Sequence, residues 1–553
     1  MLRRLAVFSG GFTLESAEAV AAAGDTAAED VLDLVTRLVD CSLLVAPPAT
    51  GHHDGVAAGG PRYRMPESVR TYGLEWLAEA GEAGAVRTRH AEHVAERASA
   101  HPHGPEQPLW LDRLDAETLN LWSALDLAVA TGAGRVALRL VNAASWYWFL
   151  RGRIGDARRA PARALERADG LPGDGDGDTG GAGPREAAGA RARLAAFTVL
   201  AGQARPFAPG VEAFVGADLR GRWLLEFARL GFADACGDAD DSALDELPCL
   251  FRDLGDRWGE AVALSCLATR ALYRGDLAEL RRNAGAAAAA FGELGDRWGL
   301  LQSSEQLGIL AEIGGDYPEA ARLHRDGLHG ARELRLWTQV SFLLARLGRT
   351  ALLTGDHARA DALHEEARAL AAEQSHRPAE QFAEIGLALG ARRRGDLDAA
   401  ATRLLPWLDG NRRLGADSGH ALILPQLGYV AELRGDAERA YALHRDGLVA
   451  ARRSGDPRAL ALAFEGLAGA ASAAAVPWDP AGRAAGAAGL LGTAAVLRDS
   501  LGTPLPPAER EDADRATARL RSVLGDEVFG AEFARGRTAA PDAQGPCPPT
   551  PAA

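Results

Sequence analysis

The sequence predicts an all-α protein: a right-handed superhelix of paired helices that follows a small winged-helix-like module with a two-stranded wing. Two observations predict the paired helices: a Gly-Asp dipeptide recurs every forty residues, and small residues recur at fixed distances from it. Helical patterns and two strand-like runs within the first eighty residues predict the module. The length of 553 residues favours several domains or a repeat array over a single core.

The module is expected to begin with two short helices. Leu2, Leu5 and Phe8 have helical spacing, so a short helix is predicted at the start of the chain. Thr13 is placed to cap a second helix, which runs to about Ala23.

A third helix, a wing and a closing helix complete the module. Thr26 and Glu29 have the spacing of a capping box ahead of an amphipathic helix. Residues 42–46 and 62–65 are candidate strands joined by a Gly/Pro-rich loop, and residues 67–80 are expected to form the closing helix. The apolar residues of the third helix are Val31, Leu34, Val35 and Leu38.

Two registers of turns follow one another along the repeats. A second set of Gly-Asp turns, at Gly255, Gly295 and Gly455, lies between the members of the first set. Two turns in forty residues predict two helices of about four turns each. The first set is Gly275-Asp276, Gly315-Asp316, Gly355-Asp356, Gly395-Asp396 and Gly435-Asp436.

The residues around each turn explain why it ends one helix and begins the next. Glycine accepts the left-handed conformation at a helix end, and aspartate caps the following helix. Small residues at the same places in each unit let the helices pack closely. This spacing resembles tetratricopeptide repeats in a longer form of about forty residues. In the unit that turns at Gly315, the small residues are Gly308, Ala311 and Ala320.

The pattern divides the chain into five parts. The repeats are expected to number roughly nine helix pairs, with the first three less regular. A Gly/Asp-rich insertion at 170–184 and the proline-rich end of the chain are expected to be disordered. The parts are a winged-helix-like module at 1–82, connecting helices at 83–136, tetratricopeptide-type repeats at 137–500, capping helices at 501–537 and a disordered tail at 538–553.

Composition and charge disfavour several classes of partner and exclude some kinds of catalytic chemistry. The net charge of −14 repels phosphate backbones and anionic lipids, so nucleic acid and membranes are poor partners. The chain contains no lysine, which excludes Schiff-base chemistry and a lysine-dependent P-loop. No run approaches the ~18 apolar residues of a membrane span. Five widely spread cysteines favour a reducing cytoplasm: Cys41, Cys236, Cys249, Cys266 and Cys547.

Four segments resemble one family, the C-terminal half of large actinobacterial STAND-type transcriptional regulators. These are signal-transduction ATPases with LuxR-type or SARP-type DNA-binding domains. The resemblance implies the sensor and scaffold half of a regulator, without the ATP-binding module and without the added DNA-binding domain. The chain is therefore expected to be a truncated product or a stand-alone relative. The segments are 2–14, 62–72, 110–121 and 490–510.

DNA binding by the module itself is an alternative, and the charges of the module oppose it. Residues 1–80 contain six arginines against eleven acidic residues. The helix that would enter the major groove carries Asp33 and Asp40 with only Arg37. Its net negative charge repels phosphates.

The histidines and aspartates do not complete a metal site. His90 and His93 share a helical face and His101 and His103 follow, but no cysteine or carboxylate pattern completes a zinc set. After His364-Glu365, Arg368 replaces the second histidine of a zinc-protease helix. The calcium-like start at Asp174, Asp176 and Asp178 fails at Thr179 and Arg185. A repeated histidine position is interpreted as packing: His324, His364 and His444.

We therefore expect a non-enzymatic cytoplasmic scaffold with no catalytic, cofactor-binding or metal-binding residues. Its repeat groove is expected to bind a protein or peptide segment or a small effector, and self-association is a further option. Arginine and tryptophan together are typical binding anchors. The alternative is that the two tryptophans seal the joints between helix pairs. The candidate groove residues are Arg257, Trp258, Tyr273, Arg297, Trp298, Gln302 and Gln306.

Overall fold

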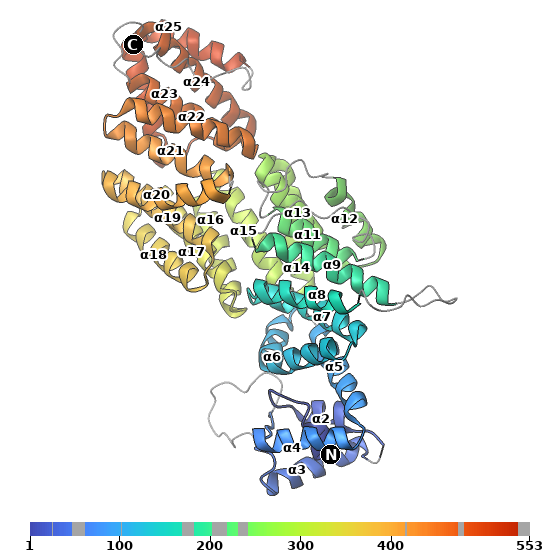
Figure 1. Ribbon diagram of the computed structural model, residues 1–553. Helices are drawn as coiled ribbons and strands as arrows, with labels where there is room; N and C mark the ends of the chain where they lie inside the picture. Colours follow the sequence, from blue (N-terminus) through green and yellow to red (C-terminus); the bar gives the residue numbers. More distant parts are fainter. Residues whose placement is uncertain are drawn as a thin grey trace. The chain divides into compact units, whose positions relative to one another are not determined.

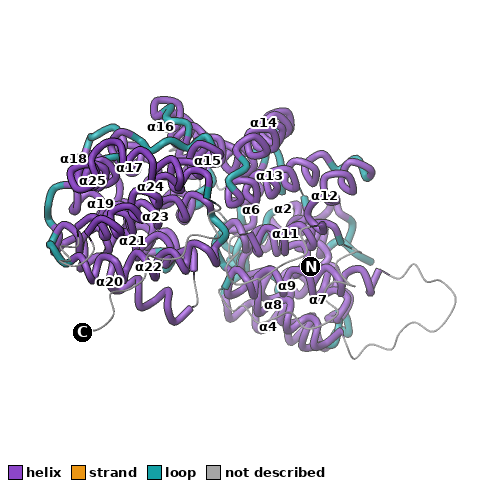
Figure 2. Tube along the Cα trace, turned by 90° about the horizontal axis from the view of Figure 1, so that it is seen from above, coloured by secondary structure: helices purple, strands orange, loops and turns teal. Residues whose placement is uncertain are grey.

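The computed structural model describes most of the chain as helices joined by short loops (Figure 2). No strand occurs among the described residues, which have only three isolated β-bridges. The all-helical class is confirmed for this part of the chain. The described residues are 1–24, 26–46, 61–100, 102–168, 182–201, 218–230, 242–414, 417–473 and 480–539.

The chain divides into two compact units, and each is considered separately. Unit 1 consists of Met1–Gly231, Cys249–Gly259 and Glu293–Arg297. Unit 2 consists of Phe232–Pro248, Glu260–Gly292 and Trp298–Ala553.

Unit 1 begins with the predicted N-terminal module. Helix α2 is capped as expected, because the Thr13 hydroxyl accepts a hydrogen bond from Ser16 N at 3.2 Å. The apolar core of the module includes Leu5, Phe12 and Val35, which are fully buried. The helices are α1 (Leu2–Leu5), α2 (Leu14–Ala21), the short 3₁₀ helix η1 (Ala28–Asp30), α3 (Val31–Asp40) and α4 (Glu67–Glu79).

The predicted two-stranded wing is wrong. Val45 pairs with Arg64, but the neighbouring Tyr63 pairs with Phe12, and both pairings are isolated antiparallel bridges. Because the run at 62–65 divides its hydrogen bonds between two segments, neither pairing grows into a strand. The loop at 47–60 lies outside the described residues.

The predicted capping box is also wrong. The helix after Thr26 begins as η1 with Ala27 as its N-cap, and no side chain caps it. Thr26 instead closes a tight turn by donating its backbone N–H to Ala23 O at 3.2 Å. Its hydroxyl accepts from Arg4 at 3.4 Å, so it does not face the helix end.

The remaining helices of unit 1 continue from the module. The predicted insertion lies largely outside the described residues, but α9 already begins at Ala182, so residues 182–184 belong to a helix. The helices are α5 (Ala83–Ser99), α6 (Gln107–Ala130), α7 (Gly134–Leu150), α8 (Ile154–Ala168), α9 (Ala182–Leu200), α11 (Leu219–Leu230) and α12 (Ser242–Asp253), the last of which is shared with unit 2.

The forty-residue period is confirmed in the helices that follow. Each forty-residue repeat consists of a first helix and a second helix of 17 or 18 residues, as predicted. The first helices are α13 (Arg257–Arg274), α15 (Arg297–Ile313), α17 (Trp337–Leu353), α19 (Arg377–Arg393), α21 (Asp417–Leu433) and α23 (Pro457–Ala473). The second helices are α14 (Leu277–Leu294), α16 (Tyr317–Glu333), α18 (His357–Glu373), α20 (Leu397–Leu414) and α22 (Ala437–Ser454).

Within unit 2 the helices from α17 onward pack in chain order (Figure 1). Each first helix contacts its own second helix and also the next first helix, as α17 contacts α18 and α19. The chain then continues through α24 (Pro480–Leu501), the 3₁₀ helix η3 (Pro507–Glu509) and α25 (Glu511–Thr538). No described helix is both long enough and apolar enough to cross a lipid bilayer.

The turns have the predicted chemistry. Gly315, Gly355 and Gly435 have φ values of 81°, 81° and 82°. The aspartate after each glycine caps the next helix, as Asp356 accepts from Arg359 N at 3.1 Å. In the second register, Arg335 and Ser375 adopt φ values of 53° and 54°, although neither is glycine. The forty-residue period therefore continues through these two turns even though they lack glycine.

The repeated histidines are buried packing residues, as interpreted from the sequence. His324, His364 and His444 are at most 1% exposed. Their imidazoles fill notches left by glycines on the first helices: a Cβ on Gly348 would come within 2.7 Å of His364 Cε1. One repeat later than His364, Leu404 is equally buried, and Ala388 stands where the three histidine-containing repeats have glycine.

Candidate functional site

Trp258, a predicted groove residue, lies inside an aromatic cluster of unit 1. Its ring stacks on His103 with centroids 3.6 Å apart and meets Trp223 edge-on at 5.2 Å. The Arg220 guanidinium lies 4.4 Å from the Trp258 ring centroid. The side chain is 5% exposed, so it packs against neighbouring helices and does not line an open groove.

The two predicted arginines in unit 1 are more accessible. Arg257 is exposed and forms an ion pair with Glu293, which is also exposed. Arg297 is half-buried. An exposed ion pair of this kind contributes little to stability.

The predicted groove residues in unit 2 are divided between core and surface. Trp298 is 1% exposed, and the Gln306 amide donates to Ser265 O at 2.8 Å and to Thr269 at 2.9 Å. Tyr273 is exposed and Gln302 is half-buried. The seven residues therefore do not form one accessible surface, because the two tryptophans and Gln306 are used to join successive helices.

A cleft of about 320 Å³ lies elsewhere, between repeat helices of unit 2 and the chain's own C-terminal segment. Arginines of α19 line it together with charged residues of the C-terminal segment, and Leu397 and Leu433 also contribute to the lining. The charged lining residues are Arg392, Arg393, Glu509, Glu511, Asp512 and Arg515.

Glu509 is held by arginines from two first helices. Arg349 of α17 donates to the Glu509 carboxylate at 3.1 Å and 3.5 Å, and to Glu312 of α15 at 2.7 Å. Arg393 of α19 donates to Glu509 at 3.5 Å and to Leu352 O at 3.0 Å. One carboxylate of η3 thus joins α17 to α19.

Asp512 continues the same line of charges. It accepts from Arg392 of α19 at 2.7 Å and from Arg515 of its own helix at 2.6 Å. On α21, Glu432 accepts from Arg519 at 2.8 Å and from Arg515 at 3.4 Å. The C-terminal segment therefore presents two carboxylates and then two guanidiniums to residues of opposite charge on α17, α19 and α21.

The ionisation of this cluster follows from its burial and its partners. Burial alone would raise the pKa of Glu509, but Arg349 and Arg393 outweigh it and hold that pKa below its usual range. Burial opposes the charge of Asp512 in the same way, and Arg392 and Arg515 lower its pKa overall. Burial lowers the pKa of Arg393. Both carboxylates are thus ionised because the repeat helices supply cations.

The sequence contained a signal for this cleft that was not used. Three consecutive arginines end helix α19, from Arg392 to Arg394, at the point where the helix dipole favours cations. The acidic partners of Arg393 and Arg392 come 116 and 120 residues later, within a segment selected only for its family resemblance. Local spacing does not reveal a pairing over that distance.

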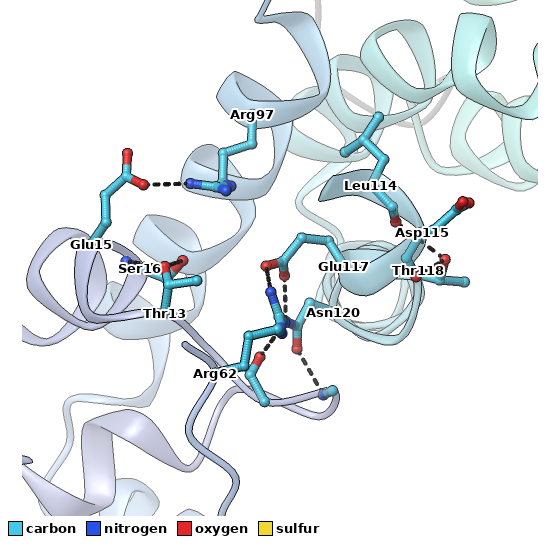
Figure 3. Close-up of polar contacts among 12 residues, drawn as sticks. Thr13, Glu15, Ser16, Arg62, Arg97, Leu114, Asp115, Glu117, Thr118 and Asn120 are labelled. Carbon is cyan, nitrogen blue, oxygen red and sulfur yellow. Dashed lines mark hydrogen bonds and ion pairs between the residues drawn. The ribbon is translucent and has the colours of Figure 1, made fainter. Parts of the chain in front are cut away.

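The N-terminal module has a polar junction with helix α6 (Figure 3). Asn120 accepts from Ser9 N at 2.8 Å and from Gly10 N at 3.0 Å, and it donates to Gly11 O at 2.9 Å. Arg62 donates to Glu117 at 2.5 Å. Asn120 is fully buried, so these bonds fix the turn at Gly10 and Gly11 against α6.

The outer face of helix α3 is acidic and partly apolar. Asp33, Arg37 and Asp40 are exposed, and Leu32 is 48% exposed. Phosphate contacts require an excess of cations, and this face lacks one.

No three histidine, cysteine, aspartate or glutamate side chains among the described residues are placed to hold a metal ion. His90 is 2% exposed, and burial lowers its pKa to about 4. His93 lies 3.1 Å from the Ser16 hydroxyl. His101 and the aspartates at 174, 176 and 178 lie outside the described residues.

Residues 1–78 match the family model of the winged helix-turn-helix domain. The N-terminal module is therefore a winged helix-turn-helix domain, even though its wing is not a regular two-stranded sheet.

Two mycobacterial relatives are similar to parts of the chain. "Putative HTH-type transcriptional regulator Rv0890c" of Mycobacterium tuberculosis is 36% identical over 156 residues, which are 28% of this chain and 17% of that protein. "Uncharacterized protein Rv0894" of the same organism is 41% identical over 97 residues, which are 17% of this chain and 23% of that protein. The chain thus spans less than a quarter of the length of either relative.

A solved structure aligns over most of the chain. It is the STAND protein with a tetratricopeptide repeat sensor from Pyrococcus horikoshii. The TM-score is 0.35 and the identity 14%, and the alignment covers 96% of this chain and 64% of the other.

Proposed function

We propose that this chain is a non-enzymatic regulatory scaffold of a transcriptional regulator, whose helical repeats bind a protein or peptide segment or a small effector. The winged helix-turn-helix match and the similarity to an HTH-type regulator support the regulatory class. The binding role is supported by one observation above all. The first helices α17, α19 and α21 already bind a helical segment of this chain through side chains of opposite charge.

The finer assignment follows the family resemblance of the four sequence segments. Under this assignment, the chain corresponds to the winged-helix and repeat portion of a cytoplasmic STAND-type regulator of the LuxR or SARP kind. Its helix pairs would continue as a right-handed superhelix. The module at 1–82 would then act by packing against other protein surfaces, and self-association remains an option for the exposed Leu32.

Two measurements on the full chain test the binding role. The first is a thermal-shift screen against metabolites, and the second is capture of partners from a lysate. We expect a ligand or partner whose binding is lost in the double variant Arg392→Gln/Arg393→Gln. Arg394→Gln is the matched control, because Arg394 pairs with Asp361 of α18 at 2.9 Å and does not line the cleft. A set of screens without any ligand or partner contradicts the proposal.

A second candidate is a DNA-binding transcription factor that acts through the winged helix. The match of residues 1–78 favours it, whereas the charges on α3 oppose it. We expect no shift of random or promoter DNA by the full chain at low salt. A shift that Arg37→Gln abolishes would establish this candidate and remove the packing role of the module.

A further inference from the structure

The C-terminal helix is held in two different ways along its length. After Gly525, whose φ is 74°, the helix packs on α24 through apolar and small residues. A Cβ on Gly492 would overlap the backbone of Phe533, so the two helices approach closely there. Before Gly525, only Ala516 and Leu520 are buried. Leu520 and Leu524 pack in the apolar core with residues of α23 and α24, whereas residues 509–519 are bound to α17, α19 and α21 by ion pairs and hydrogen bonds.

The repeat side of this contact needs carboxylates. The side chains of Arg392 and Arg393 are 10% and 11% exposed, and the residues described here that offer them carboxylates are Asp512 and Glu509. A buried guanidinium without a counter-ion is strongly destabilising. Whatever covers this face of α19 must therefore bring negative charge with the same spacing, three residues apart.

We propose that the face of α17, α19 and α21 is a docking site for an acidic helical segment of a partner protein, and that residues 507–519 of this chain occupy it as an internal ligand. The proposal rests on the proposed function and names the chemistry of the partner. The partner carries two carboxylates three residues apart, in the positions of Glu509 and Asp512. Basic residues one and two turns later, in the positions of Arg515 and Arg519, meet Glu432.

The cleft beside the internal ligand supports an exchange of segments. It lies along Glu509, Glu511 and Asp512 on one side and along Arg392 and Arg393 on the other. Arg392 Nε is buried and has no hydrogen-bond partner among the described residues.

The charges of the site favour a peptide over a nucleic acid. Glu312, Glu432 and Glu465 lie on the neighbouring first helices α15, α21 and α23, and the Glu432 side chain is buried. A continuous phosphate backbone would meet these carboxylates, whereas a segment with acidic residues followed by basic ones pairs with the arginines and with Glu432.

The test uses the full chain and a fluorescent peptide with the sequence of Thr503–Leu524. The variant Glu509→Gln/Asp512→Asn weakens the internal ligand, so we expect it to bind the peptide at least tenfold more tightly than the wild type. Adding Arg392→Gln/Arg393→Gln is expected to abolish binding, whereas adding Arg394→Gln is expected to leave it unchanged. A peptide with Gln and Asn in place of its own two carboxylates is expected not to bind.

Equal binding by wild type and the Glu509→Gln/Asp512→Asn variant overturns the proposal, as does binding that survives the arginine substitutions. Hydrogen exchange of the wild type supplies a test that needs no substitution. We expect amides at 509–519 to exchange faster in high salt while those at 527–536 do not change, and a common rate for both halves contradicts the proposal. Peptide binding without any natural ligand would refute only the proposed function. A natural ligand whose affinity is unchanged by Arg392→Gln/Arg393→Gln would refute only this inference.

Discussion

The N-terminal module with its junction to α6 and the histidine positions of the unit 2 repeats bury polar side chains in opposite ways. In the module and at its junction with α6, the buried Arg4 and Asn120 side chains are each bonded to several groups. Arg4 donates to Glu82 and to the backbone oxygens of Ala21 and Ala23 at 2.7 to 3.1 Å, and Asn120 binds three backbone groups of one turn. In the repeats His324 and His444 are fully buried, and neither ring nitrogen has a hydrogen-bond partner among the described residues.

The difference shows what specifies each region. Hydrogen bonds have direction, so the network around Asn120 permits one conformation of a loop that lacks regular structure. In the repeats the shape of the helices specifies the packing, because the imidazoles of His364 and His444 each fit against two glycines and that of His324 fits against one. The module should therefore be sensitive to the loss of hydrogen-bonding groups, and the repeats to added volume.

The largest effect is expected from Asn120→Ala, at the junction of the module with α6. The substitution leaves the N–H groups of Ser9 and Gly10 without their acceptor and removes a donor from Gly11 O. Unsatisfied buried groups cost about 1–3 kcal/mol each, so we expect a loss of about 4 kcal/mol. The free energy of opening of α1–α4, measured by native-state hydrogen exchange, checks this.

Asp126→Ala is the matched control on the same helix. Asp126 pairs with Arg163, and both side chains are more than 40% exposed. We expect little change in this variant. An equal loss in both variants would mean that α6 itself had been weakened, and the comparison between module and repeats would fail.

Gly386→Ala should have the next largest effect, in the repeats. A Cβ at this position would overlap the His364 imidazole, which is fixed from the other side by Gly348. Overpacking of this kind costs about 1–3 kcal/mol, and we expect the upper end of that range because the imidazole has no room to move. Thermal unfolding and exchange of α18 and α19 measure it.

Two companion variants sharpen this result. Gly330→Ala on α16 has nothing within 4 Å of its Cβ and should stabilise the helix by up to ~1 kcal/mol. Adding His364→Ala to Gly386→Ala should recover part of the loss. If the recovery is absent, the notch does not determine the packing of these repeats.

A smaller effect is expected from the protonation of the same histidine. Burial lowers the pKa of His364 from 6.5 to about 4, so the folded state keeps the ring neutral while the unfolded chain takes up a proton. Stability therefore falls as pH falls from about 6.5 to about 4, by up to ~1.4 kcal/mol per pH unit.

The double variant His364→Leu/Gly348→Ala copies the neighbouring repeat, which has Leu404 and Ala388. We expect this variant to fold. Its stability should fall less steeply between pH 7 and pH 5.5, because the contribution of His364 is absent. Urea unfolding at pH 7 and pH 5.5 gives the slope. An unchanged slope would mean that His364 binds protons equally in the folded and unfolded states.

The sequence predicted what local chemistry determines. The caps at Asp276, Asp316 and Asp356 and the helix period follow from residues a few positions apart, and they are confirmed. The wing failed because Tyr63 pairs with Phe12, which lies far away in the sequence. Pairings of this kind have no local pattern.

The groove residues illustrate the same limit. Trp258 and Trp298 each precede a glycine that faces a phenylalanine of the preceding helix, Phe251 or Phe291. The spacing identified the helix, but which of its faces meets the neighbour depends on packing across the turn. The cleft was missed because Arg349 and Glu509 are 160 residues apart.

The smallest effect is expected at the two turns where the repeat has lost its glycine. Arg335 and Ser375 adopt the left-handed conformation that glycine takes at the corresponding turns, for example at Gly295 and Gly455. That conformation costs a non-glycine residue roughly 1–2 kcal/mol, whereas glycine loses about 0.5–1 kcal/mol more backbone entropy on folding. Ser375→Gly should therefore stabilise the repeats by about 0.5–1 kcal/mol in thermal unfolding. Ser375→Ala should not, because alanine keeps the Cβ that makes the turn costly; if both variants behave alike, these turns follow from helix packing and not from backbone preference.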